Sequence, residues 1–120
     1  MSHLRWATDR TLAALEAVGV RATADPRNVN PPVVLVTPDT STRRTTAMVE
    51  VRLTLDLIAP GPANLDAIHA VDALEAHVTP ALDAAGIPWQ TGLITTTPSP
   101  SSGDSLLTYQ LAVTIPTRKA

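Results

Sequence analysis

The clearest pattern in the chain is a run of alternating apolar and polar residues, VEVRLTLDL. The apolar positions of this run are Val49, Val51, Leu53, Leu55 and Leu57, and the polar positions are Glu50, Arg52, Thr54 and Asp56. A period of two predicts a β-strand, which we place at 46–58. A strand covered on both faces would be continuously apolar, so the polar face of this strand is expected to meet water or a polar partner. The sequence Pro60-Gly61-Pro62 follows and is expected to end the strand.

Two other segments carry apolar residues at helical spacing. The first covers residues 4–18, with Ala7, Leu12 and Leu15 on one side and Gly19 just beyond its end. The second covers residues 64–85. Its apolar positions are Leu65, Ile68, Val71, Leu74, Val78 and Leu82. Spacing of three and four predicts an amphipathic helix in both segments. Asn64 is a plausible N-cap of the second helix, Gly86 closes it, and Pro80 is expected to kink or split it.

Three further strands are predicted. A short β-branched strand covers 33–36, a third strand covers 89–97, and a fourth covers 106–115. Residues 20–32 are expected to form a loop. The polar segment 37–46 is expected to form a long hairpin loop with Arg43 and Arg44 at its tip. A second long loop, PSPSSGDS, separates the last two strands.

The predicted order is helix, strand, strand, helix, strand, strand. One apolar sheet face and two amphipathic helices indicate an α+β fold. We expect a two-layer sandwich with a four-stranded mixed sheet and both helices on one face. The long helix is expected to return the chain, so that the third strand runs parallel to the second. The 120 residues fit a single domain spanning 1–120.

Composition narrows the function classes. The formal net charge is −2, so no overall basic surface favours nucleic acid. Cysteine is absent, which excludes disulfides and thiolate metal sites. No apolar run approaches the length of about 18 residues that a membrane span needs, and the charged start of the chain does not resemble a signal peptide. We therefore expect a soluble protein.

Catalytic motifs are lacking. His69 and His77 lie eight residues apart, about 12 Å along a helix, which is too far for one metal ion. Asp72 and Glu75 are neighbours on the polar side of that helix, where a solvated face is the usual state. No Gly-x-Ser-x-Gly elbow and no glycine-rich phosphate loop occur. We expect no enzymatic activity, no metal and no cofactor.

Two groups of polar residues remain as candidate contact sites. Arg43 and Arg44 could reach a phosphate or an acidic neighbour, or they could form a solvated loop tip. Glu50, Arg52 and Asp56 form a charged stripe on the polar face of the long strand. This stripe is either an ordinary solvent-exposed face or a subunit contact or pore lining.

The whole pattern resembles the tail terminator family of long-tailed bacteriophages, also called head–tail joining proteins. The resemblance covers nearly the whole chain. It is carried by LRWATDRTLAALEAVGV, VVLVTPDTSTRRTTAMVEVRLTLDLIAPGP, NLDAIHAVDALEAHVTPAL, WQTGLITTTP and LLTYQLAVTIPT. The family has no catalytic signature, so what matches is the order of elements, the strand–Pro-Gly-Pro–helix junction and the length.

The resemblance implies a structural virion protein at the head–tail interface, assembled in the host cytoplasm. It implies a homohexameric ring that caps the tail tube, meets the head connector and lets genomic DNA pass without specific binding. The resemblance itself assigns no residues. From their positions we expect Arg43 and Arg44 to lie in an assembly loop, and the face with Glu50, Arg52 and Asp56 to line the channel. Two alternatives remain open: a small enzyme or ligand-binding domain with a pocket between the long helix and the sheet, and a monomeric adaptor that binds through a sheet edge.

Overall fold

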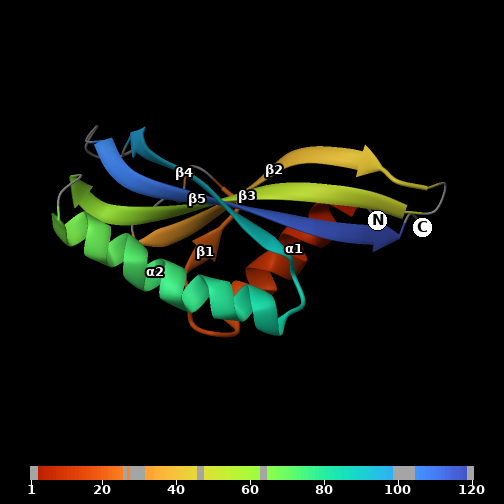
Figure 1. Cartoon of the computed structure of the whole chain (residues 1–120), viewed down its shortest axis with the longest axis horizontal. Coiled ribbons are helices and arrows are strands. Elements are labelled where there is room, and N and C mark those ends of the chain that lie inside the picture. Colours follow the sequence, from red (N-terminus) through yellow and green to blue (C-terminus); the bar gives the residue numbers. More distant parts are fainter. Residues whose placement is uncertain are drawn as a thin grey trace.

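Two helices and five strands make up the computed structural model, which describes residues 3–25, 27, 32–45, 48–62, 65–98 and 105–118. The elements are α1 (His3–Glu16), β1 (Ala22–Thr23), β2 (Val33–Arg43), β3 (Met48–Pro62), α2 (Leu65–Ala84), β4 (Trp89–Pro98) and β5 (Ser105–Arg118). The strands form one sheet in the order β1-β2-β3-β5-β4 (Figure 1). The predicted α+β class with a mixed sheet and two helices is confirmed.

The number of strands was predicted wrongly, because the sheet has five strands and not four. The additional strand is β1, which pairs in parallel with β2 through Ala22 and Thr23 and makes the sheet mixed. Two residues are too few to show a period, and they lie in a segment that was expected to be a loop. All other pairs are antiparallel. Since β3 and β4 are each antiparallel to β5, they run in the same direction, as predicted, with β5 between them.

The core lies between β3 and the two helices. All five apolar residues of the VEVRLTLDL run are at most 7% exposed. They belong to one cluster with Ala7 and Leu15 of α1 and with Val78 and Leu82 of α2. Figure 1 shows both helices below the strands, on the same side of the sheet. The register of β3 and the placement of both helices on one face are therefore as predicted.

Both helices end in the same way. Gly19 and Gly86 have φ values of 78° and 70°, a conformation that favours glycine. After α1, Gly19 N donates to Glu16 O and Val20 N donates to Leu15 O. The equivalent two bonds follow α2, and the residue after each glycine, Val20 or Ile87, is buried. This pair of bonds is the Schellman motif.

Pro80 does not split α2, which is one continuous helix from Leu65 to Ala84. The expectation of a second short piece was wrong. Proline removes one backbone donor and crowds the preceding turn, but burial of Ala81 and Leu82 in the core holds the last turn in place. Asn64, the expected N-cap, lies outside the described residues.

The expected long hairpin loop is mostly strand. β2 continues to Arg43 and pairs with β3 as far as Arg43↔Val49, with one irregularity between Pro38 and Thr40. Threonine suits an extended strand, and pairing with the long β3 extends β2 well beyond its apolar start. β3 is also longer than expected and reaches Pro62, with an irregularity after Ile58. Of the second expected loop, residues 99–104 lie outside the part of the chain that the structure describes.

Leu53→Ala should lower the free energy of unfolding by about 2–5 kcal/mol, because Leu53 is fully buried where β3 packs against the two helices. Urea unfolding followed by circular dichroism measures the change. Thr40→Ala, at an exposed position of β2, is the control and should shift stability by less than about 0.5 kcal/mol. Equal stability of Leu53→Ala and wild type would contradict the assigned core.

Candidate assembly surfaces

The sheet face opposite the helices is polar and rich in threonine. Glu50, Arg52 and Asp56 alternate with the buried residues of β3 and lie on this face, as predicted. The strand register places further side chains beside them, namely Thr37, Thr40 and Thr42 of β2 and Gln110, Ala112 and Thr114 of β5. We call this surface the open face.

The charges on the open face are balanced largely within the chain. Arg44 Nη2 lies 3.0 Å from Glu50 Oε1, and this hydrogen-bonded pair lowers the pKa of Glu50 and raises that of Arg44. Arg52 Nε lies 4.0 Å from Asp39 Oδ2. These ion pairs are exposed, so each stabilises the fold little. Asp56, in contrast, forms no ion pair with another of the described residues.

Asp56 stands at the boundary between the polar part of the open face and a small apolar cluster. Opposite it in the register are Leu35 on β2 and Gln110 on β5. The cluster consists of Val33, Leu35, Ile58 and Leu106. Burial raises the pKa of Asp56, and a side-chain hydrogen bond with Gln110 opposes that rise. Its Oδ1 is buried and has no hydrogen-bond partner within the described part of the chain.

Arg43 and Arg44 lie where β2 ends and not at the tip of a ten-residue loop. Arg43 is the last residue of β2, and its Nε donates to the carbonyl of Thr45 at 3.4 Å. Arg44 is engaged by Glu50. The two side chains are exposed but held by local contacts, so their role in assembly stays a prediction.

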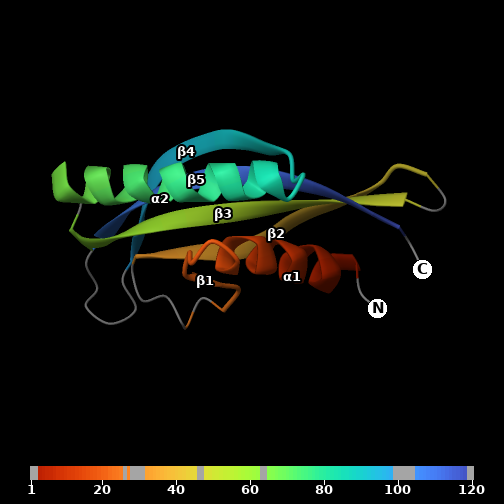
Figure 2. The same cartoon turned by 90° about the horizontal axis from the view of Figure 1, so that it is seen from below.

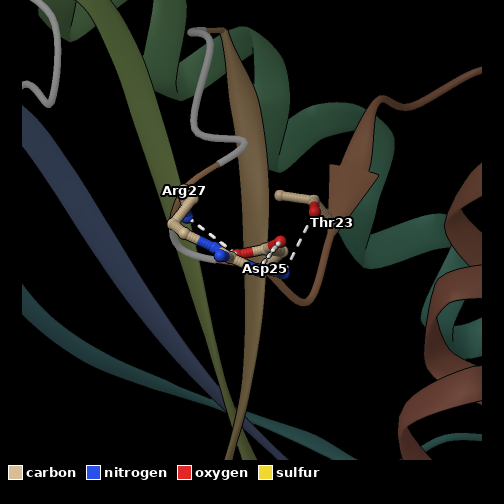
Figure 3. A network of polar contacts seen from close by, with 3 residues as sticks. All are labelled: Thr23, Asp25 and Arg27. Carbon is tan, nitrogen blue, oxygen red and sulfur yellow. Dashed lines mark hydrogen bonds and ion pairs between the residues drawn. The ribbon is translucent and has the colours of Figure 1, made fainter.

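A further polar network lies just after β1, and it is structural. The Thr23 hydroxyl accepts from Asp25 N, and the Asp25 carboxylate accepts from Arg27 N at 2.9 Å and from the Arg27 guanidinium (Figure 3). The backbone bond from Arg27 is the main cause of the lowered pKa of Asp25. Each member bonds to another member, so the network holds the turn that follows β1.

The β4 edge is the least protected part of the sheet. β4 ends the strand order, and its residues 90–96 are exposed and uncharged. Leu93 is 72% exposed and Ile94 is 73% exposed. Sheet edges are usually blunted by charges, proline or a covering element, and an apolar uncharged edge favours pairing with another chain. The outer edge of β2, by contrast, carries Pro38, Asp39 and Arg43.

A bulge shapes the β4 edge at Gly92. The register with β5 shifts between Thr91 and Ile94. A Cβ on Gly92 would lie 2.5 Å from the carbonyl oxygen of Gln110, so only glycine lets the two strands approach this closely. The bulge therefore fixes where Leu93 and Ile94 project.

A groove of about 410 Å³ lies between α2 and the β4–β5 edge. It is lined by Ile68, Val71, Asp72 and Glu75 of α2 and by Ile94, Leu107 and Tyr109 of the sheet. Ile68 is 54% exposed. Burial and then a hydrogen bond with Glu75 raise the pKa of Tyr109. The groove is thus apolar with an acidic margin.

Sequence reasoning named a helix–sheet pocket only as an alternative and did not identify these residues. Ile68 and Ile94 look like ordinary core positions in the sequence, and only the packing of α2 leaves both exposed. His69 and His77 are exposed on α2. No cluster of three potential metal ligands occurs among the residues that the structure describes.

Comparison with protein-family models gives no match, and comparison with curated proteins gives no relative. Among the described segments, no helix combines the length and apolar character required to cross a membrane.

Asp56→Asn should stabilise the protein at pH 7 by roughly 1 kcal/mol, at the low end for a buried unpaired polar group because the side chain is only half-buried. The folded state raises the pKa of Asp56, so the proton is bound more tightly there than in the unfolded chain. The contribution of Asp56 is therefore favourable below the unfolded pKa and is lost as pH rises through the folded pKa.

Urea unfolding between pH 3 and pH 7 measures this effect. The advantage of Asp56→Asn should shrink towards pH 3, where the wild-type carboxyl is protonated. Asp72→Asn, at an exposed position of α2, is the control. A constant difference between Asp56→Asn and wild type across this pH range would argue against a raised pKa.

Proposed function

We propose that the protein is a structural subunit that assembles with copies of itself into a ring. The observation that supports this proposal best is the uncharged β4 edge with its exposed Leu93 and Ile94. Full burial of such a side chain contributes about 1.5–3 kcal/mol, so a neighbour that covers Leu93 and Ile94 would be bound more tightly. The molecule measures 47 × 26 × 22 Å, and β4 presents this edge over its ten residues, Trp89–Pro98.

A head-to-tail contact suits this surface better than a two-fold contact. The groove beside β4 carries Asp72 and Glu75. Two β4 edges that met across a two-fold axis would bring these carboxylates of both copies towards one seam. The two sheet edges also differ in character, since the β2 edge carries proline and charges. A contact between unlike surfaces closes into a ring when its rotation allows closure.

The resemblance to phage tail terminators specifies the rest of the proposal. The ring is homohexameric, caps the tail tube, contacts the head connector and sits in the virion at the head–tail interface. Genomic DNA crosses the ring along the open face. That face suits passage, because threonine dominates it and its charged residues are mostly paired with opposite charges. Few unpaired cations are available for phosphate contacts, which would hold the DNA.

Ile94→Lys should convert the assembled protein into a monomer of 12.6 kDa, because a lysine on an edge strand opposes pairing with another chain. Light scattering coupled to size-exclusion chromatography measures the mass. Ala73→Lys, which adds the same charge at an exposed position of α2, should assemble like wild type. A wild-type protein that is monomeric at every concentration would refute the ring and favour an adaptor that binds a peptide at β4.

Lysines on the open face should make the ring retain DNA. Thr40 and Thr42 are exposed and lie opposite Arg52 and Glu50. We expect Thr40→Lys combined with Thr42→Lys to bind a labelled DNA duplex with an affinity that falls steeply with salt. Fluorescence anisotropy at several salt concentrations measures this binding.

The control for the lysine variant places the same charge on the helix layer, as Ala73→Lys combined with Ala76→Lys. Both of these positions are exposed on α2. If both double variants bind DNA equally, the open face has no special relation to DNA, and its proposed role as a channel lining is wrong.

A further inference from the structure

Besides β4, a second exposed surface of unusual composition lies on α1. Trp6 is 36% exposed, and the guanidinium of Arg10 stacks over its ring at 5.6 Å. Arg10 also donates to the carbonyl of Ala85 at 3.0 Å, which fixes the arginine in this position. Tryptophan and arginine are among the residues most enriched at the energetic centres of protein interfaces. We call this pair the Trp6–Arg10 knob.

The knob and the groove are complementary in two respects. The groove presents aliphatic side chains, with Ile68 and Ile94 exposed, and the knob presents an aromatic ring. The margin of the groove carries Asp72 and Glu75, whereas the knob carries a cation. An indole that enters the groove would therefore bring Arg10 towards two carboxylates.

The knob of one chain cannot reach its own groove. The first turns of α1 and the first turns of α2 lie at opposite ends of the molecule, and the two helices occupy different sides of the helix layer (Figure 2). Each chain thus has one groove and one knob that its own fold does not bring together. When the knob of one copy binds the groove of a second, the pair still has one open groove and one open knob, so further copies can add until a ring closes.

We propose that the groove between α2 and the β4–β5 edge receives the Trp6–Arg10 knob of a second copy of this chain. This inference rests on the proposed ring and identifies its interface. The groove continues the β4 edge, because Ile94 belongs to both. One neighbour covers the exposed edge residues and fills the groove in the same contact.

Two single variants separate the two halves of the contact. Ile68→Glu places a charge in the groove without changing β4, and Trp6→Glu removes the ring from the knob. Both positions are at least one-third exposed, so we expect both variants to fold. Their matched controls are Ala73→Glu on α2 and Ala17→Glu just after α1, each adding one negative charge at an exposed position. Circular dichroism and thermal unfolding verify that each variant is folded.

Each variant alone should weaken assembly at least about tenfold, because a carboxylate would replace an apolar contact. An equimolar mixture should form heterodimers, since the intact groove of Trp6→Glu accepts the intact knob of Ile68→Glu. No larger species should form, because the other two surfaces are defective. Native mass spectrometry with one variant labelled with ¹⁵N identifies the composition of each dimer.

The outcomes distinguish this inference from the proposed ring. Assembly that persists in both single variants overturns the knob–groove contact and leaves the ring in place. Folded variants that form no heterodimer when mixed also overturn the contact. A groove that binds a small apolar probe, while Ile68→Glu removes that binding and leaves assembly unchanged, is a ligand site instead. Wild-type protein that never assembles overturns both proposals.

Discussion

Burial of one face of β3 is the constraint on which the rest of the structure depends. Five apolar side chains on alternate positions are removed from water by two helices that share one layer. A strand has only two faces, so the same alternation places Glu50, Arg52 and Asp56 on the opposite side. β3 also lies between β2 and β5, which satisfy its backbone along most of its length. The unpaired edges are consequently displaced to the two outer strands.

The two edges of the sheet deal with this exposure differently. The β2 side is partly covered by β1 and carries a proline and charges, whereas β4 carries an uncharged run with two large apolar side chains exposed. In an isolated domain, a charge in β4 would protect the edge against pairing with another chain. The absence of charge in β4 and the acidic groove beside it therefore support the proposal that this side is a contact surface. The polar face of the sheet is expected to remain in contact with water.

The charges on the open face are set by ion pairs between neighbouring side chains more than by the net charge of the chain. Arg44 and Glu50 are brought together by the β2–β3 hairpin, and Arg52 lies near Asp39 because the irregularity in β2 places Asp39 beside the strand pair. Asp56 differs because its neighbours in the register are Leu35 and Gln110. Asp39 is thus solvated whereas Asp56 is partly desolvated, and the register of the sheet decides this difference.

The sequence alone determined the α+β class, both helices, the register of β3 and the identity of its buried face, because these follow from local periodicity and from glycine at the helix ends. Tertiary structure decided the rest. β1 exists because β2 provides a partner for two residues, and β2 reaches Arg43 because β3 is long enough to pair with it. α2 passes Pro80 unbroken because core packing outweighs one lost hydrogen bond. The groove likewise depends on how α2 lies across β4 and β5, a long-range arrangement that no local pattern encodes.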